Sequence, residues 1–289
     1  MYAGLTLVTP PAGEPVSIAT LKNHARVTVA VDDGMLGGYI TAARQHAEDY
    51  TNRALLTQTW RLALRSFPGR DYVSTSREWT SLEQYYRWNY IAIPRPPLIA
   101  VSAFTYTDTS GTVFNMTQGF SALMGNYLAP DLNFEPARLY LPFSGVWPTT
   151  ILLPGSAIQI TYSAGYPSFS GVVNVDTTGK ILTWVSGSVF DPTMAGSFID
   201  VAGQSATVQT VTSGTSLTLQ NGIAASQLNQ AYTANGVPHS IKQAILIHAA
   251  HLYQNRESYL VDSDFTETPL AARSLLDQYR NFHAIQEND

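Results

Sequence analysis

Cysteine is absent from the sequence. No disulfide, thiolate nucleophile, or zinc or iron–sulfur site that needs cysteine ligands is therefore available to this chain. The absence leaves the redox compartment open. It does narrow the metal chemistry that the remaining side chains are able to support.

Charged residues are also scarce. They make up 13% of the 289 residues, about half the usual share, and the balance of 16 basic against 21 acidic residues gives a net charge of −5. The lysines are Lys22, Lys180 and Lys242. This balance argues against a sequence-independent grip on nucleic acid, which needs a basic surface. A weakly charged polar surface suits a protein that is pressed against neighbours.

Long apolar runs are missing as well. No run approaches the roughly 18 residues of a membrane span, and residues 1–15 lack the basic start and apolar core of a signal peptide. We therefore expect a soluble protein that is assembled in the cytoplasm of its host. The apolar share of 45% supports a sizeable core, in one large domain or two moderate ones.

Helical periodicity opens the sequence. Ser17 is placed to cap a short helix that runs through Arg26, and Asp32-Asp33 is placed to cap a second one. In the second helix, apolar residues recur at steps of three and four: Leu36, Ile40, Ala43, Ala47 and Tyr50. Gly37-Gly38 weakens this helix by roughly 1 kcal/mol per glycine. Either another backbone approaches closely there, or the first turn is frayed.

Helical periodicity returns near the end of the sequence. Pro238 occupies a plausible first-turn position, and Thr268-Pro269 marks a second helix start of the same kind. The first of these helices has an apolar stripe of Ile241, Ala244, Ile245, His248 and Leu252.

Between the helical ends, the apolar period becomes that of strands. From Gln58 onward, Trp60, Leu62 and Leu64 alternate with polar or small residues, the pattern of a half-buried strand. Further strands are expected at residues 90–93, 101–107, 138–141 and 157–162. The prolines at 94, 96 and 97 predict an extended turn between two of them, because proline lacks a donor and fixes φ.

The composition changes abruptly after residue 166. Residues 171–236 hold eight of the 20 glycines and only four charged residues, Asp176, Lys180, Asp191 and Asp200. Short strands at 181–185, 198–201, 206–211 and 216–219 fit between the glycines, a spacing typical of a small β-sandwich or barrel. We interpret residues 167–236 as an inserted β module, and residues 1–166 and 237–289 as a discontinuous core of helices with β segments. The predicted fold class is α+β, a helical bundle core with β-strand additions and this all-β module.

Two groups of residues contain potential metal ligands, but neither has the spacing of a known metal-binding motif. His248 and His251 lie three apart on one predicted helix, but the sequence His-Ala-Ala-His lacks the glutamate of the metalloprotease motif. Asp262, Asp264 and Glu267 form a compact acidic loop without calcium-loop spacing. Ordinary packing or hydrogen bonding between helices is the favoured role of the histidines. A solvated loop is the favoured role of the acidic group, with Asp264 open to a subunit contact.

Catalytic and cofactor motifs are absent. Neither G-x-x-x-x-G-K nor G-x-G-x-x-G nor G-x-S-x-G occurs in the sequence. A catalytic triad assembled only in space stays formally open, but no spacing favours one. We therefore predict no enzymatic activity, no catalytic residues, no cofactor and no metal.

An unusual aromatic and arginine-rich stretch spans residues 72–90. Its members Tyr72, Trp79, Tyr85, Tyr86 and Trp88 are the candidate contacts to a neighbouring subunit or ring. Aromatic residues together with arginine are typical both of proteins that bind single-stranded nucleic acid and of the hot spots of protein–protein interfaces. The acidic balance favours the protein interface, and a structural lid over the core is the third interpretation.

Five segments, taken in order, resemble the phage head–tail connector proteins, the adaptor family that includes the HK97-type and phiE125-type connectors. The segments are Pro-Val-Ser-Ile-Ala-Thr-Leu-Lys-Asn-His-Ala-Arg-Val (15–27), Ala-Glu-Asp-Tyr-Thr-Asn-Arg-Ala-Leu-Leu-Thr-Gln-Thr-Trp (47–60), Ile-Pro-Arg-Pro-Pro-Leu (93–98), Ile-Thr-Tyr-Ser-Ala-Gly-Tyr (160–166) and Val-Pro-His-Ser-Ile-Lys-Gln-Ala-Ile (237–245). In the family, the fourth segment leads almost directly to the fifth. About 70 residues intervene here, which supports the interpretation of an insertion.

The resemblance implies a virion protein at the head–tail interface of a tailed bacteriophage. Twelve subunits would form a ring below the portal, join it to the next tail-proximal protein (a stopper, tail terminator or tube), and line a channel through which DNA passes without specific binding. No membrane is involved. Because C-terminal segments of the family reach the portal, the candidate portal contacts are Phe265, Leu275, Tyr279 and Phe282. The inserted module is expected to point outward.

Two rival interpretations of function remain. The polar β module and the many aromatic residues are also typical of a carbohydrate-binding or adhesin-like protein, and a hydrolase with a spatially assembled triad is the third class. Carbohydrate binding needs aromatic side chains on one exposed face. Residues 171–236 hold four aromatic residues, and we expect most of them to point inward instead: Trp184, Phe190, Phe198 and Tyr232.

Overall fold

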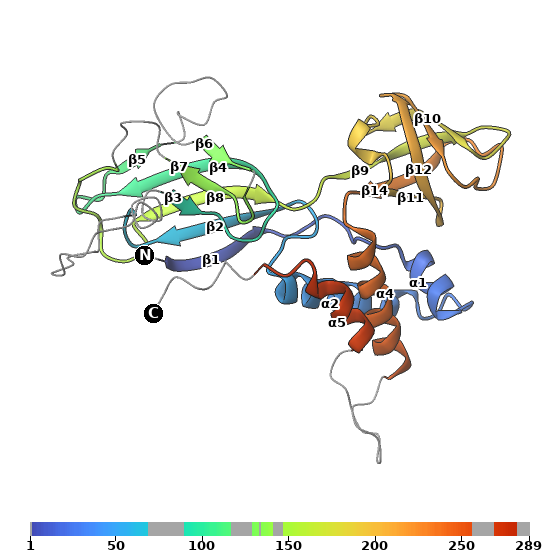
Figure 1. The fold of residues 1–289 in the computed structure, drawn as a ribbon, viewed down its shortest axis with the longest axis horizontal. Coiled ribbons are helices and arrows are strands. Elements are labelled where there is room, and N and C mark those ends of the chain that lie inside the picture. The colour runs from blue at the N-terminus through green and yellow to red at the C-terminus, as the bar shows by residue number, and fades with distance from the viewer. Residues whose placement is uncertain are drawn as a thin grey trace, which may run out of the picture. The chain divides into compact units, whose positions relative to one another are not determined.

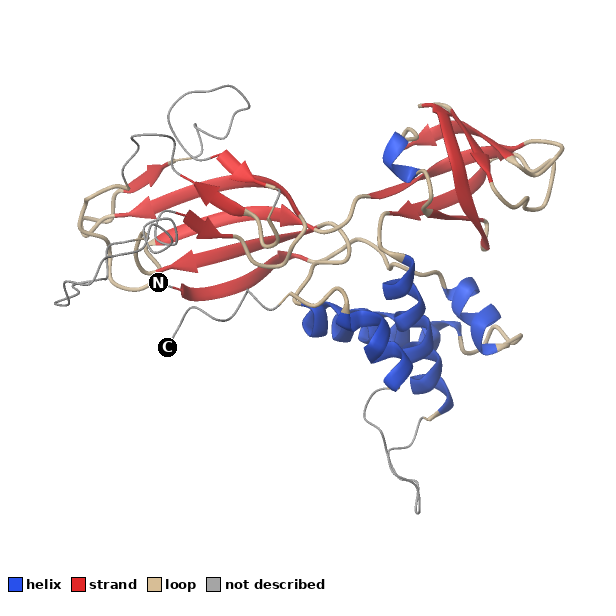
Figure 2. Ribbon diagram, viewed as in Figure 1, coloured by secondary structure: helices blue, strands red, loops and turns tan. Residues whose placement is uncertain are grey.

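A computed structural model describes residues 2–68, 90–116, 129–132, 134–140, 147–255 and 269–281. The chain forms two compact units. Residues 1–12, 52–165 and 281–289 make the sheet unit, and residues 13–51 and 166–280 make the helix–barrel unit. Figures 1 and 2 show strands in both units and all described helices in the second. The predicted α+β class is confirmed.

The sheet unit is built on a five-stranded antiparallel sheet. Its strands, in spatial order, are β1 (Tyr2–Thr9), β2 (Gln58–Leu64), β8 (Ile158–Ala164), β4 (Leu98–Thr107) and β5 (Val113–Asn115). Leu62 and Leu64 are buried, as the alternation from Gln58 predicts. The N-terminal edge strand β1 was not expected from the sequence.

A smaller sheet completes the core of this unit. It contains β3 (Tyr90–Ala92), β7 (Arg138–Tyr140) and β6 (Ala129–Asp131). Phe67 lies at the centre of the aromatic part of the core, stacked on Trp147 at a centroid distance of 5.3 Å and edge-on to Tyr106 at 5.5 Å. These large side chains supply most of the apolar area that the unit removes from water.

The proline-rich turn joins three of the family-like segments. Its carbonyl groups accept hydrogen bonds from the Tyr162 hydroxyl (to Pro94, 2.9 Å), the Ala54 amide (to Pro96, 3.1 Å) and the Gly165 amide (to Pro97, 2.9 Å). Prolines remove donors but keep their acceptors, so this segment suits a position between donor-rich neighbours.

Gly165 is required by this arrangement. It has a φ of +127°, and a Cβ atom there would lie 2.1 Å from the carbonyl oxygen of Leu56. The Ala-Gly-Tyr and Ala-Leu-Leu-Thr-Gln pieces of the motifs are therefore in direct backbone contact. Any side chain at position 165 would separate them.

Four helices form the helical part of the second unit: α1 (Ile18–Ala25), α2 (Asp33–Thr51), α4 (His239–Gln254) and α5 (Leu270–Asp277). α4 packs against α1, α2 and α5. The predicted Ser17 cap is confirmed, because its hydroxyl accepts a hydrogen bond from the Thr20 amide at 3.1 Å. Among the described residues, no helix is long and apolar enough to cross a membrane.

Of the two interpretations left open for Gly37 and Gly38, the close approach of another backbone is wrong within the described chain. α2 begins at Asp33 and runs through both glycines. Within the described chain, the nearest atom to a Cβ at Gly37 would be Cδ1 of Ile18, 3.7 Å away, and no atom lies within 4 Å at Gly38. A side chain from α1, rather than another backbone, occupies the space beside Gly37.

The β module is a closed six-stranded barrel. Its strands follow the order β10 (Ile181–Gly187), β13 (Ser216–Leu219), β12 (Gln204–Ser213), β11 (Phe198–Val201), β14 (Gln230–Asn235) and β9 (Ser168–Val175). A short 3₁₀ turn, η2 (Pro192–Met194), precedes β11. Closure pairs every strand and removes the exposed edges that promote aggregation. The all-β module is thus confirmed; its status as an insertion at residues 167–236 stays a prediction.

Candidate functional site

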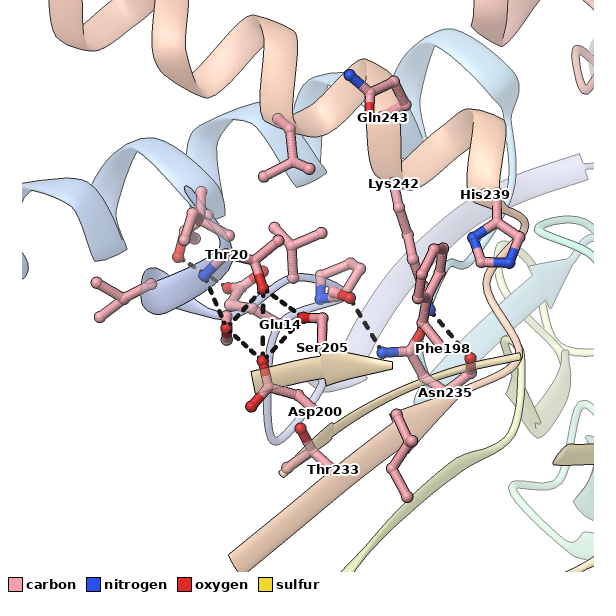
Figure 3. A pocket seen from close by; sticks show the side chains of 18 of the residues that line it. Glu14, Thr20, Phe198, Asp200, Ser205, Thr233, Asn235, His239, Lys242 and Gln243 are labelled. Atoms are coloured by element: carbon pink, nitrogen blue, oxygen red, sulfur yellow. Dashed lines mark hydrogen bonds between the residues drawn. The ribbon is translucent and has the colours of Figure 1, made fainter. Parts of the chain in front are cut away.

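A cavity of about 970 Å³ lies within the helix–barrel unit, between its helices and the barrel. Figure 3 shows that the labelled side chains converge on it from α1 and the segment before it, from α4, and from the barrel strands β11, β12 and β14. Its volume is at the upper end of the range for ligand pockets in proteins. Leu275, a predicted portal contact, lines it from α5. We call this space the Lys242 cavity, after the lysine in its wall.

Asp200 organises the polar end of the cavity. One carboxylate oxygen accepts hydrogen bonds from the hydroxyls of Ser17 (2.8 Å), Ser205 (3.3 Å) and Thr20 (3.4 Å), and the other accepts from the Gly203 amide (2.9 Å). These bonds tie the start of α1 to the β11–β12 hairpin. The negative charge of Asp200 is therefore satisfied by protein donors.

Glu14 is satisfied in the same way. Its carboxylate accepts hydrogen bonds from the Arg44 guanidinium at 2.7 Å and from the Thr41 hydroxyl at 2.8 Å. Arg44 also pairs with Glu48 at 2.7 Å, and its side chain is only 7% exposed. A largely buried cation that bridges two carboxylates holds the segment before α1 against α2.

Lys242 forms the other end of the cavity. Its ammonium group donates to the backbone carbonyl of Asn235 at 3.2 Å and lies 5.6 Å from the ring centroid of Phe198. The Asn235 side chain in turn donates to the Pro15 carbonyl at 3.1 Å. Lys242 is 7% exposed, and burial lowers the pKa of its ammonium group to about 8.

Two histidines meet at the interface between α2 and α4. The rings of His46 and His248 are perpendicular, with their centroids 4.7 Å apart. Burial, followed by the charges of His46 and His251, lowers the pKa of His248 to about 4. The packing role expected for His248 is thus the one observed. No group of three potential metal ligands occurs among the described residues.

α5 is fastened to α2 through Tyr50. The Arg273 Nε donates to the Tyr50 hydroxyl at 3.1 Å, and the guanidinium of Arg280 lies 5.0 Å from the Tyr50 ring centroid. Tyr50 also donates to Asp277. These contacts fix the helix that carries Leu275, which is half-buried.

Most of the predicted contact residues lie outside the described chain. These are Phe265, Phe282, Tyr72, Trp79, Tyr85, Tyr86 and Trp88, together with the acidic group Asp262, Asp264 and Glu267. Leu275 and Tyr279 are described, and both are partly buried. The contact role of all these residues stays a prediction.

The sequence analysis missed three residues of the cavity: Phe198, Asp200 and Lys242. Most aromatic residues of the barrel were expected to point inward, whereas Phe198 is 38% exposed and lines the cavity. One signal for Lys242 was available. It follows Ile241 in a helix that is otherwise almost free of charge, an uncommon place for a lysine.

Comparison with protein families gives one match. Residues 15–84 match the family described as "Phage gp6-like head-tail connector protein". The matched segment includes α1, α2 and β2, and with them two of the five segments that carried the resemblance. The resemblance inferred from the sequence is confirmed. A search of curated proteins gave no match.

Comparison with solved structures shows the same overall fold in particles called gene transfer agents (GTA). A chain in "Virion of native gene transfer agent (GTA) particle" is 17% identical, with 98% of both chains covered and a TM-score of 0.52. A chain in "Neck of native GTA particle computed with C12 symmetry" is 17% identical over 99% of this chain and 100% of that one, with a TM-score of 0.51. A chain in "Neck of empty GTA particle computed with C6 symmetry" is 16% identical over the same shares, with a TM-score of 0.51.

These findings support a structural connector role. The family match is local to residues 15–84, whereas the fold similarity extends over nearly the whole chain, barrel and sheet included. The matched family is a structural one.

Proposed function

We propose that this chain is a head-to-tail connector subunit of a tailed bacteriophage or phage-like particle, located at the head–tail interface of the virion. The match of residues 15–84 to the head–tail connector family carries the proposal. The fold supports it, because chains from the necks of gene transfer agent particles share it from end to end.

The proposed assembly is a ring of twelve subunits below the portal. A head-to-tail contact that is repeated by rotation closes into a ring when the rotation angle permits. One neck that contains a chain of this fold was computed with C12 symmetry, which supports twelve as the subunit number. The partners are then the portal on one side and the next tail-proximal protein on the other.

The charge of the chain fits a channel through which DNA slides. A protein that holds DNA does so mainly by neutralising phosphates with lysine and arginine. With a net charge of −5 and 13% charged residues, this chain offers little of that attraction. DNA would pass a ring of such subunits without being retained.

The portal contact is assigned to the C-terminal part, with Leu275 and Tyr279 as its described members and Phe265 and Phe282 beyond them. Tyr50, Arg273 and Arg280 fix the α5 region against the bundle, so this surface is presented on a rigid support. The candidate contacts at Tyr72, Trp79, Tyr85, Tyr86 and Trp88 are assigned to a neighbouring subunit or ring.

Mass photometry of the purified chain, alone and mixed with its portal ring, tests the proposal. The subunit mass is 31.5 kDa, so twelve copies add about 380 kDa to the portal. A step of that size is the expected result. The connector role would be contradicted if the portal mass stays unchanged at protein concentrations well above the dissociation constant of a typical stable interface.

Carbohydrate binding, the main alternative, finds little support in the barrel. Phe190 and Tyr232 are buried in its core, and Trp184 is only partly exposed. Phe198 is exposed but lines the Lys242 cavity. The described barrel thus presents no row of exposed aromatic rings on which a sugar would stack.

A further inference from the structure

The ammonium group of Lys242 has unused bonding capacity. It carries three N–H donors, and the hydrogen bond to the Asn235 carbonyl at 3.2 Å uses one. Figure 3 shows the side chain running from α4 past the Phe198 ring toward Asn235, at the edge of the cavity. A buried cation with a single neutral acceptor is costly, because its lost hydration is poorly replaced.

The two acidic groups of the cavity do not compensate this charge. Glu14 is bound by Arg44 and Thr41, and Asp200 is bound by three hydroxyls and one amide. Among the described residues, every ion pair within 4 Å is made by Lys22, Arg44 or Arg53, and none by Lys242. The position of Lys242 therefore favours an incoming negative charge.

The remaining lining favours an apolar partner. Val16, Ile40 and Leu246 are buried in the cavity wall, and Phe198 exposes 38% of its surface there. Exposed aromatic rings such as this one are enriched at protein–protein interfaces, where apolar side chains pack against them. A ligand that fits both features combines an apolar body with one carboxylate.

We propose that the Lys242 cavity is a docking site for an apolar peptide segment with a carboxylate, supplied by a neighbouring protein of the neck. The carboxylate pairs with the Lys242 ammonium group, and the apolar side chains pack against Phe198 and Leu246. This assignment rests on the proposed connector function. Lys242 makes no ion pair among the described residues, and the charge complementarity between its ammonium group and a carboxylate identifies the chemistry of the occupant.

The lowered pKa of Lys242 gives the experiment its readout. Burial lowers this pKa to about 8, and a bound carboxylate raises it by favouring the charged form. The chain has only three lysines, Lys22, Lys180 and Lys242, so protein with ¹³C-labelled lysine gives three Cε resonances. Lys180 is exposed on the barrel and serves as the internal control.

Octanoate, an eight-carbon carboxylate, is the probe, with octan-1-ol as its uncharged counterpart. We expect octanoate to move the Lys242 resonance saturably and raise its titration midpoint, while the Lys180 resonance stays in place. Octan-1-ol binds at least about ten-fold more weakly, as expected for the loss of a charge-assisted hydrogen bond. An unmoved Lys242 resonance, or equal binding of the two probes, overturns the assignment.

Lys242→Met keeps the length of the side chain and removes the charge, and Lys180→Met is the matched control. We expect octanoate affinity to fall at least about ten-fold in Lys242→Met and to be unchanged in Lys180→Met. A urea midpoint of Lys242→Met that is no lower than that of the unaltered chain verifies that its fold is intact. Equal octanoate affinity in both variants contradicts the proposal.

Assembly on the portal separates this proposal from the connector function. Lys242→Met is expected to need at least about ten-fold more protein than Lys180→Met to complete the ring. If both variants assemble like the unaltered chain, the docking role of the cavity is refuted and the connector role stands. If the unaltered chain fails to join the portal although octanoate still shifts the Lys242 resonance, the connector role is refuted, and the proposed partner with it.

Discussion

Acid should destabilise the helix–barrel unit through His248. Its pKa is about 4 in the folded protein, against an ordinary value of 6.5, because burial and the neighbouring His46 and His251 disfavour the charged imidazole. Between these two values, the unfolded chain binds more protons than the folded one. The free energy of unfolding therefore falls as the pH drops from about 6.5 to about 4.

The size of this effect follows from the two pKa values. Each pKa unit corresponds to about 1.4 kcal/mol, so the upper limit is about 3 kcal/mol. His248 is 8% exposed, and screening by the solvent that it still contacts reduces the expected loss to about 2 kcal/mol. His248→Gln removes the titrating group. Between pH 6.5 and pH 4, its free energy of unfolding should therefore fall by about 2 kcal/mol less than that of the unaltered chain.

Urea unfolding followed by ellipticity at 222 nm measures this loss, because every described helix belongs to the helix–barrel unit. The slope with pH is compared between the unaltered chain, His248→Gln and the control His24→Gln, whose histidine is exposed on α1. Carboxylates also titrate in this pH range, but their contribution is the same in all three proteins and drops out of the comparison. If His248→Gln keeps the full pH dependence of the unaltered chain, the reasoning is refuted.

Three further predictions follow from the contacts. Gly165→Ala should destabilise the sheet unit by at least about 3 kcal/mol in chemical denaturation, because its Cβ would overlap a backbone carbonyl. The control Gly155→Ala, at a φ of +102° but with open space around the new Cβ, should cost only about 1 to 2 kcal/mol. Equal losses in the two variants would contradict the role of the overlap. Arg44→Met should lower the free energy of unfolding by about 3 kcal/mol at neutral pH, because the carboxylates of Glu14 and Glu48 lose their shared cation. The loss should be smaller at acidic pH, where these carboxylates are protonated. A loss that does not depend on pH would exclude this cause. Leu275→Ala should weaken docking on the portal in mass photometry, whereas Leu270→Ala, on the exposed face of the same helix, should not; equal docking would remove Leu275 from the contact.

Local signals predicted the elements well where side-chain pattern and backbone agree. The Ser17 cap and the alternation from Gln58 both mark elements observed in the structure, and β11 and β13 have the expected bounds. Each of these depends on hydrogen bonds or burial within a few residues of the signal. Their recognition requires no knowledge of distant contacts.

The strands that close or extend the sheets could not be predicted in this way. β9 and β14, which close the barrel, lack a clear apolar alternation, because two adjacent valines (Val172 and Val173) interrupt it in β9 and Tyr232 is the only large apolar residue of β14. Their pairing with each other and with β10 and β11 makes them strands. β1 likewise depends on its antiparallel pairing with β2, whose partner residues are 50 to 62 positions further along the chain.

The Lys242 cavity depends on contacts that are still more distant. Asn235 and Pro15 are 220 residues apart in sequence, and Ser17 and Asp200 are 183 apart. No local pattern indicates that these residues meet. The sequence offered one signal, the single lysine of an otherwise almost uncharged helix, and only the fold showed what surrounds it.

Cryo-electron microscopy of the assembled particle, with the neck reconstructed without imposed symmetry, tests the connector role most directly. The account predicts twelve copies of this chain in a ring between the portal and the next tail-proximal protein, with DNA or an open channel on its axis. A particle in which this chain occupies the tail fibres or the capsid surface, or in which the portal joins the tail without it, would contradict the account.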